Sequence, residues 1–239
     1  MSAFETIDYV KQGNGIAVLT LNRPEALNAF NVQMRDHVYE ALTAVRDDDD
    51  VRGLLVRGAG ERAFCAGADL AEFGSAPSQA IARSVRWERD VWGLWLSITK
   101  PMVAAIHGFC LGSGVEIASV CDVRIAADDA RFGMPEVSLG LIPAAGGTQL
   151  LPRLLGQGRA LDLLLTGHRF TATDALRYGL VSEVTSRGML EARALDTLDT
   201  MLQAPCGTLA AAKWVVSEGL DLPLAEALAL ERRIGRTLT

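Results

Sequence analysis

The pattern of apolar and polar residues differs between the early half of the chain and its last third. Short apolar runs typical of β-strands dominate early, and we expect strands at residues 5–11, 15–21, 51–57, 102–109 and 123–127. Gly13-Asn14-Gly15 joins the first two runs and is typical of a tight hairpin turn. Apolar residues at helical spacing predict a helix that Asn31 caps and that runs through Arg46.

Helical spacing dominates the later part of the chain. We expect a helix over about 78–99, one from about Val115, and further helices at 147–155, 158–166, 172–178, 188–203, 207–218 and 223–234. Strands that alternate with helices and are followed by a helical tail indicate an α/β core with a helical C-terminal region, not two independent folds.

Composition and charge narrow the class of protein. The 239 residues include 23 basic and 29 acidic side chains, a formal net charge of −6. We expect no nucleic-acid partner and no membrane partner, because such partners select a basic surface. The N-terminal sequence lacks the apolar segment of a signal peptide, and no segment is apolar enough to span a bilayer, so we expect a cytoplasmic protein.

The cysteines are too widely spaced for a zinc site or a disulfide framework, and we expect four small core residues, Cys65, Cys110, Cys121 and Cys206.

Two loops of small residues each follow a predicted strand and precede a helical segment. One is Phe64–Leu70 (FCAGADL) and the other is His107–Gly114 (HGFCLGSG). Small residues let backbone N–H groups approach a ligand closely, and the unpaired N–H groups at a helix start carry partial positive charge. Two such loops that meet would form an oxyanion hole, in which N–H donors stabilise negative charge that develops on an oxygen.

Two glutamates lie among apolar residues near the second loop. Glu116 follows Val115 in the first turn of the predicted helix, and Glu136 lies 20 residues later, after Pro135. A simpler interpretation of Glu116 is that it only complements the helix dipole. Two carboxyl groups in apolar surroundings favour one raised and one ordinary pKa, the arrangement that general acid–base catalysis uses.

Longer runs of the sequence resemble the enoyl-CoA hydratase (crotonase) family. These runs are LNRPEALNAFN at 21–31, AFCAGADL at 63–70, KPMVAAIHGFCLGSGVEIASVCDVRIA at 100–126, ARFGMPEVSLGLIPAAGGTQLLPRLLG at 130–156 and LLLTGHRFTATDALRYGLVSEV at 163–184. The resemblance implies an α/β fold, the ClpP/crotonase-like spiral of ββα units, over residues 1–185. It also implies a C-terminal helical region at 186–239 that serves oligomerisation and closure of the active site. The sequence ends at Thr239, where members of the family commonly continue into a last helix.

The resemblance also implies a reaction, the addition of water across the 2,3 double bond of an enoyl-CoA thioester. Two oxyanion-hole donors of the family match the N–H groups of Ala68 and Ser113, and two catalytic glutamates match Glu116 and Glu136. By this resemblance, Glu116 deprotonates the attacking water and Glu136 delivers a proton to the α-carbon. No cofactor or metal is implied, because coenzyme A is part of the substrate.

The family's binding of CoA implies further site residues. Arg23 and Arg62 are the candidates for binding the anionic end of CoA, although each is as simply interpreted as a solubilising surface residue. The remaining matched positions for CoA or substrate are Ala26, Ala66, Asp69 and Leu70. The family also implies a homotrimer or a dimer of trimers.

Ser113 stands where the family usually has glycine. A serine is strained there if the backbone needs a positive φ. A rival hypothesis makes Ser113 the nucleophile of a hydrolase with His107 as its base, but the outer glycines of a G-x-S-x-G elbow are absent.

Other functions within the fold stay open. The alternatives are an enoyl-CoA or dienoyl-CoA isomerase, a cyclic dienoyl-CoA hydratase, and a non-catalytic crotonase-fold RNA-binding protein. The pair of glutamates favours hydration, because simple isomerases of the family generally keep one carboxylate, and the acidic charge disfavours RNA. Trp87, Trp92 and Trp95 are either core residues or part of the acyl pocket.

Overall fold

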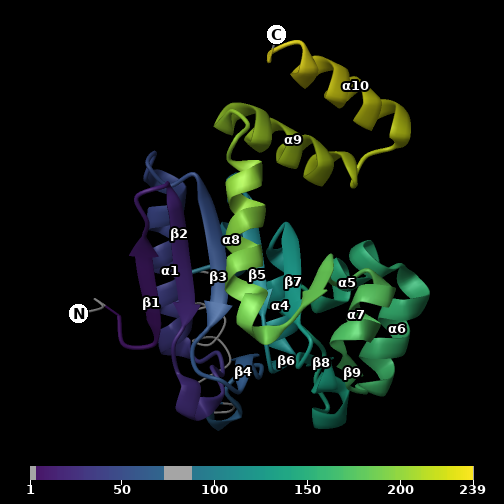
Figure 1. The fold of residues 1–239 in the computed structure, drawn as a ribbon. Coiled ribbons are helices and arrows are strands. Elements are labelled where there is room, and N and C mark those ends of the chain that lie inside the picture. The colour runs from purple at the N-terminus through teal and green to yellow at the C-terminus, as the bar shows by residue number, and fades with distance from the viewer. Residues whose placement is uncertain (1–3, 73–87, 239) are drawn as a thin grey trace.

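A six-stranded sheet forms the centre of the fold (Figure 1). The computed structural model describes residues 4–72 and 88–238. The strand order is β1-β2-β3-β5-β7-β10, with bounds Ile7–Lys11, Ile16–Leu21, Gly53–Gly58, Met102–Ile106, Val123–Ala127 and Glu183–Thr185. β1 and β2 are antiparallel across the predicted hairpin, and the other neighbouring strands are parallel. The predicted early strands are therefore confirmed, except that the run predicted over 102–109 is interrupted after Ile106.

A second, smaller sheet lies at one end of the first (Figure 1). Its order is β4-β6-β8-β9, with bounds Ala63–Cys65, Phe109–Leu111, Arg131–Gly133 and Phe170–Thr171. The chain crosses from β5 to β6 at Gly108, where φ is 52° and an added Cβ would lie 2.1 Å from the Arg62 carbonyl oxygen. Only glycine fits this turn, and it is what divides the predicted strand in two. A long strand is followed by a short one in β3–β4, β5–β6 and β7–β8, which is the repeating unit of the predicted spiral.

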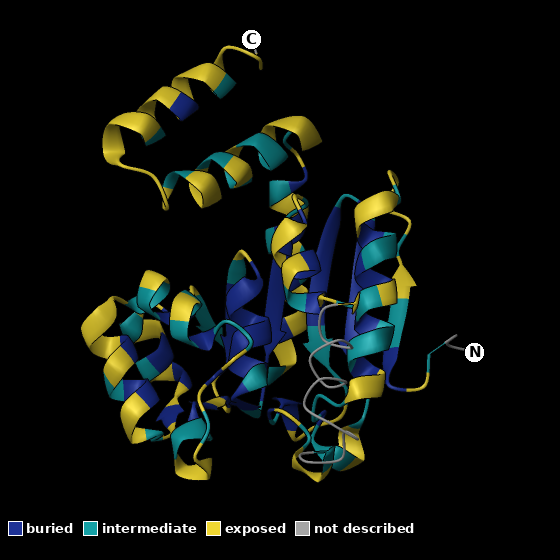
Figure 2. Cartoon of the chain, turned by 180° about the vertical axis from the view of Figure 1, so that it is seen from behind, coloured by how far each residue is buried: buried dark blue, intermediate teal, exposed yellow. Residues whose placement is uncertain are grey.

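Helices cover both faces of the large sheet. One face packs on α1 (Val32–Asp47), α3 (Val91–Ser97) and α4 (Ser113–Val120), and the other packs on α8 (Leu190–Met201). Figure 2 shows the buried strands between these helices. α1 begins at its predicted cap, because the Asn31 side chain accepts the Met34 N–H at 2.8 Å. α4 begins at Ser113, two residues before the predicted start.

The later helices follow the predicted ranges closely. α5 (Gly147–Leu155), α6 (Gln157–Thr166) and α7 (Ala172–Tyr178) lie beside the small sheet, and α9 (Cys206–Gly219) and α10 (Leu224–Gly235) project together beyond α8 (Figure 1). The run predicted over 188–203 divides into a 3₁₀ turn, η4 (Arg187–Met189), and α8. Further 3₁₀ turns are η1 (Pro24–Ala26), η2 (Leu70–Glu72) and η3 (Pro135–Leu139). The first part of the helix predicted over 78–99, with Trp87, lies outside the described residues, and α3 forms its end.

The core contains most of the residues expected there, with one exception. Cys65, Cys110 and Cys121 are buried, whereas Cys206 lies exposed at the start of α9, so its prediction as a core residue is wrong. Trp95 is fully buried and stacks with Trp92 at a ring-centroid distance of 6.2 Å, which makes both part of the packing around α3.

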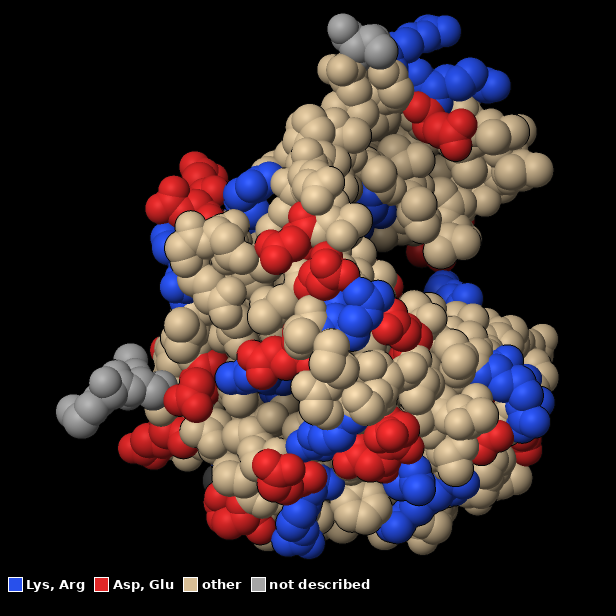
Figure 3. Space-filling model, viewed as in Figure 1, with Lys and Arg blue, Asp and Glu red and all other residues tan. Residues whose placement is uncertain are grey.

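Surface charge is mixed on the face shown in Figure 3, where acidic and basic side chains are interspersed. Across residues 4–72 and 88–238, no helix is long and apolar enough to cross a membrane. Within the same ranges, no group of three or more His, Cys, Asp and Glu side chains could hold a metal ion.

Candidate active site

The two loops of small residues meet in the structure. A Cβ added to Gly67 would lie 3.2 Å from the Leu111 carbonyl oxygen and 3.9 Å from the Gly112 Cα. A Cβ added to Gly114 would lie only 2.2 Å from the Cys65 carbonyl oxygen. The backbones can touch in this way only because glycines occupy these positions, so the two loops do meet, which is the condition for an oxyanion hole between them.

The N–H group of Ala68 points away from the segment that pairs with the first loop. It forms an isolated parallel bridge with Phe30, in which the Phe30 N–H donates to the Gly67 carbonyl at 2.8 Å and the Asp69 N–H donates to the Phe30 carbonyl at 3.1 Å. In a parallel bridge of this kind, the residue between the two bonded peptides points its own N–H away from the partner segment, so the Ala68 N–H points away from Phe30. Among the described residues, no backbone carbonyl accepts the Ala68 N–H.

Ser113 presents the second N–H group as the first residue of α4. The first N–H groups of a helix lack partners within the helix, and no carbonyl in the described ranges accepts that of Ser113. The left-handed backbone conformation in this loop belongs to Gly112, whose φ is 49°. Ser113 itself does not have a positive φ, so replacing the family's glycine with serine keeps the donor without the backbone strain considered above.

Glu116 is held by the start of a different helix. Its side chain is buried in the first turn of α4, with the residue 2% exposed. The Oε1 atom accepts the N–H groups of Ala145 and Gly147, each at 2.9 Å. Gly147 opens α5, so the carboxylate lies at a helix N-terminus, where the partial positive charge stabilises it. Glu116 therefore does more than complement the dipole of α4, because α5 orients it.

Glu136 lies in the 3₁₀ turn η3, close to the second loop. A Cβ added to Gly112 would be 2.8 Å from the Glu136 Oε1, which places this carboxyl group directly beside the second loop. The Oε2 atom is buried and has no hydrogen-bond partner among the described residues. Burial raises the pKa of Glu136, its own backbone N–H partly offsets this, and the charge of Glu116 raises the pKa further.

The two carboxyl groups are therefore chemically different. Two N–H groups favour the ionised form of Glu116, whereas the surroundings of Glu136 favour its protonated form. Two unlike carboxyl groups border the same pair of loops as two N–H donors that have no backbone acceptor in the described ranges, and such a set can move protons while stabilising an oxyanion. The sequence did not identify Ala145 and Gly147 as the groups that hold Glu116, although Gly146-Gly147 was visible as the start of a helix.

Most of the residues predicted to bind CoA gather around the first loop. The Arg23 guanidinium donates to the Ala29 carbonyl at 2.7 Å and to the Asp69 carboxylate at 2.9 Å, and both charged side chains are 19% exposed. Arg23 and Asp69 thus partner each other, and this ion pair links the turn at 22–30 to the Ala68 loop. Ala26 is half-buried in the same turn, and in the loop itself Ala66 is half-buried and Leu70 exposed. Arg62 is exposed before the start of β4, at the end of this strand opposite to the loop.

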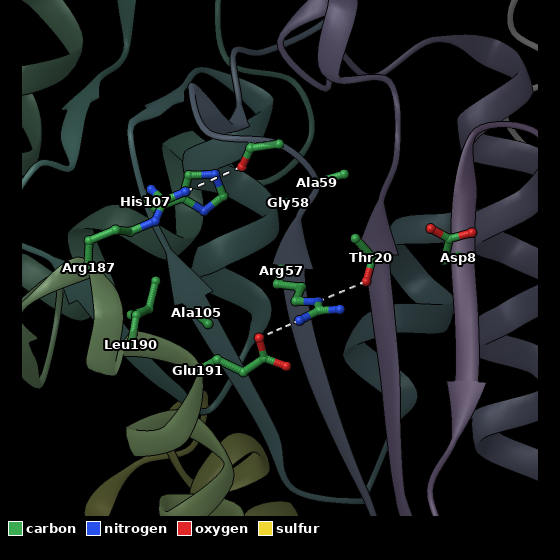
Figure 4. Close-up of a pocket in the computed structure, with 11 residues that line it drawn as sticks. Asp8, Thr20, Arg57, Gly58, Ala59, Ala105, His107, Arg187, Leu190 and Glu191 are labelled. Carbon is green, nitrogen blue, oxygen red and sulfur yellow. Dashed lines mark hydrogen bonds and ion pairs between the residues drawn. The ribbon is translucent and has the colours of Figure 1, made fainter.

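His107 lies in a separate cleft on the α8 side of the large sheet (Figure 4). This cleft of about 400 Å³ is also lined by Ala105, Arg57, Arg187, Leu190 and Glu191. Burial, with a smaller effect of Arg187, lowers the pKa of His107 to about 4. Ser113 belongs to α4, which packs on the opposite face of the sheet. The structure thus separates the two residues of the hydrolase hypothesis.

Known proteins match this chain over nearly its whole length. A family model described as enoyl-CoA hydratase/isomerase matches residues 11–239. A probable enoyl-CoA hydratase of Mycobacterium bovis is 39% identical over 234 residues, which cover 97% of this chain and 88% of that protein. A crotonyl-CoA hydratase of Syntrophomonas wolfei is 38% identical over 229 residues, covering 96% and 88%. The crystal structure of an enoyl-CoA hydratase from Bacillus anthracis has a TM-score of 0.91 and 34% identity, covering 97% of this chain and 90% of that chain.

Proposed function

The chain belongs to the enoyl-CoA hydratase/isomerase family and is an enzyme of the hydratase class, and we propose that Glu116, Glu136 and the N–H groups of Ala68 and Ser113 carry its reaction. The reaction adds water across the 2,3 double bond of an enoyl-CoA thioester. The observation that supports this assignment is the pair of unlike carboxyl groups beside the joined loops.

The N–H groups of Ala68 and Ser113 stabilise the thioester oxygen. As water adds to the β-carbon, electrons move onto this oxygen and the thioester becomes an enolate. Donors fixed in advance bind the enolate oxygen more strongly than the neutral carbonyl oxygen of the substrate. The contact of the Gly67 and Gly112 backbones fixes the two loops that carry these donors.

The two glutamates divide the proton transfers between them. The Glu116 carboxylate accepts a proton from water as the water oxygen bonds to the β-carbon. The protonated Glu136 donates its proton to the α-carbon, and the raised pKa of this group keeps it protonated at a higher pH than an ordinary glutamate. One water is consumed, Glu116 ends protonated and Glu136 ends ionised, and exchange with solvent restores both groups.

The pair of carboxyl groups favours hydration over isomerisation within the family. Addition of water uses a base and an acid together, whereas a single carboxyl group can move one proton between two carbons. No metal or redox cofactor is needed in this scheme, since the side chains and N–H groups supply every step. The cytoplasmic location and the absence of nucleic-acid and membrane partners remain predictions from the sequence.

A substrate panel tests the proposed function. Purified protein is mixed with crotonyl-CoA and with longer, branched and cyclic enoyl-CoA thioesters, and loss of the conjugated enoyl absorbance is followed. Mass spectrometry of the products is expected to show the gain of one water. Isomerised products without added water, or no change with any thioester in the panel, would contradict a hydratase.

We also propose that the protein assembles as a homotrimer or a dimer of trimers. α9 and α10 project from the body of the chain (Figures 1 and 2). Their exposed large apolar side chains include Trp214, Val216, Leu220, Leu224 and Leu228. A group of exposed large apolar side chains on one projecting unit is typical of a protein–protein interface.

A further inference from the structure

Asn28 is a fully buried polar residue in the turn beside the Ala68 loop, and it is 0% exposed. Its Nδ2 donates to the Ala59 carbonyl at 2.9 Å and to the Ala63 carbonyl at 2.8 Å. Its Oδ1 accepts the Arg23 N–H at 2.9 Å. The amide thus ties the start of the turn to both ends of the segment between β3 and β4, and every hydrogen of its NH₂ group is used.

The backbone of this turn has an unusual conformation. Leu27 and Asn28 have φ values of 54° and 55°, and they are the non-glycine residues with positive φ in the described part of the chain. Asparagine adopts this left-handed conformation more readily than most residues, whereas leucine rarely does. Contacts around the turn must therefore hold it in place.

The turn runs alongside the first loop from Ala63 to Asp69. The Asn28 amide holds the Ala63 carbonyl, and the Leu27 carbonyl accepts the Ala66 N–H at 3.0 Å. The Phe30 backbone then bonds to both Gly67 and Asp69, as described above. We call these hydrogen bonds, from Asn28, Leu27 and Phe30 to the segment from Ala63 to Asp69, the ladder. The ladder fixes the rotation of the peptide that carries the Ala68 N–H, because Ala68 lies between the two residues that Phe30 holds.

We propose that Asn28 is a positioning residue for the oxyanion hole. It contacts no reacting atom, and it acts through the ladder to set the direction of the Ala68 N–H. This inference rests on the proposed function, in which that N–H stabilises the enolate oxygen. Removal of the Asn28 amide leaves the Ala59 and Ala63 carbonyls without their donor and releases the loop at its first anchor, so the Ala68 N–H turns away from its acceptor.

The test compares Asn28→Gly with the unaltered protein. Glycine keeps the positive φ and removes the short side chain together with its amide. We expect kcat for crotonyl-CoA to fall about 10²-fold, as for loss of one oxyanion donor, with KM changed by less than about threefold. Infrared difference spectra of bound butyryl-CoA, which has no double bond to hydrate, report the thioester carbonyl directly. Its stretching frequency is expected to move towards that of the free thioester.

Asn31→Gly is the matched control. It removes the amide of a nearby asparagine that caps α1, whose side chain bonds to the Met34 N–H and, within the described residues, forms no hydrogen bond to the Ala68 loop. We expect a lower unfolding temperature with kcat and carbonyl frequency unchanged. If Asn28→Gly does not fold, Asp69→Asn weakens the ion pair to Arg23 on the same ladder, and a smaller shift in the same direction is expected.

Two results would overturn the role of Asn28. One is an unchanged kcat, and the other is a lower kcat with the carbonyl frequency of the unaltered protein, which would indicate a structural effect alone. Failure of the proposed function is a separate outcome. If the unaltered protein hydrates no enoyl-CoA, the hydratase assignment fails, while the carbonyl frequency still tests Asn28 because it requires binding and no turnover.

Discussion

Glu116 and Glu136 carry the same carboxyl group but lie in different surroundings. Glu116 is buried and accepts the backbone N–H groups of Ala145 and Gly147, whereas Glu136 is half-buried and its buried Oε2 atom lacks a partner in the described ranges. A carboxylate is stabilised by N–H donors and destabilised by loss of water, so the two identical side chains lie in unlike surroundings, which fit the opposite proton-transfer roles proposed for them. At this scale, the chemistry depends on a few hydrogen bonds and on burial.

Replacement of either glutamate by glutamine is expected to remove most of the activity. Glu116→Gln removes the base and Glu136→Gln removes the acid, and each should lower kcat for crotonyl-CoA about 10²- to 10⁴-fold. Circular dichroism and binding of butyryl-CoA should remain similar to those of the unaltered protein. Glu40→Gln, on the exposed side of α1, is the control and should retain full activity. A fully active Glu136→Gln variant would remove this residue from the mechanism.

The raised pKa of Glu136 also predicts a dependence of stability on pH. A carboxyl group with a raised folded-state pKa contributes stability below its ordinary pKa of 4.5, and this is lost as pH rises through the folded pKa. Glutamine does not ionise, so Glu136→Gln should become progressively more stable than the unaltered protein as pH rises from about 4 towards neutrality. Thermal unfolding across this range measures the difference. A difference that stays constant or shrinks would argue against a raised pKa.

Helix ends and glycines decide which elements can form the site. α4 supplies the Ser113 N–H and Glu116 from its first turn, and the start of α5 supplies an N–H group that holds Glu116. Gly147 is essential to this contact, because an added Cβ would lie 2.7 Å from the Pro143 Cβ and 3.0 Å from the Glu116 Oε1. The two helices can therefore approach only where one of them has no side chain.

Gly147→Ala is expected to damage the site through this contact. The methyl group must displace Glu116 or the start of α5, and a displacement of about 1 Å at a catalytic group lowers kcat about 10²-fold. Gly158→Ala is the matched control in α6, where an added Cβ meets nothing within 4 Å. It should leave kcat unchanged and stabilise the helix by about 0.5–1 kcal/mol. Steady-state kinetics and thermal unfolding of both variants provide the comparison, and equal kcat values would contradict the steric argument.

The whole molecule consists of a body that contains the site and a projecting pair of helices. The body packs helices on both faces of the large sheet around two apolar clusters. α9 and α10 pack on each other, and many of their apolar residues are exposed. Figure 2 shows that most of both helices is exposed or half-buried. Burial of these side chains against other copies of the chain would stabilise the pair.

Charged substitutions on the projecting helices should disrupt assembly without unfolding the body. Leu220 and Leu224 are 68% and 75% exposed, so Leu220→Glu with Leu224→Glu removes little packing within one chain. Sedimentation velocity is expected to show a trimer or hexamer for the unaltered protein and a shift towards monomer for the double variant. Leu165→Glu, at an equally exposed leucine on α6, is the control for an added charge elsewhere. A monomeric unaltered protein would contradict the proposed assembly.

The sequence by itself determined the order of the main elements and the residues of the candidate site. Helical spacing, the Asn31 cap and the hairpin glycines act over a few residues, so they can be recognised along the chain. The small residues of the two loops and the resemblance to the hydratase family together identified Ala68, Ser113, Glu116 and Glu136. Their catalytic roles remain predictions until the glutamine variants and the Asn28 variant are measured.

Only the tertiary structure decided how these residues are held. The strands of the small sheet have two or three residues each, too few for an alternating pattern to predict them. The N–H groups that bind Glu116 come from residues 29 and 31 positions later, and Asn28 holds a carbonyl 35 positions away. The side of the sheet on which His107 lies was likewise not visible in the sequence. Local patterns report the conformation of a segment, but contacts between distant segments depend on how the whole chain packs.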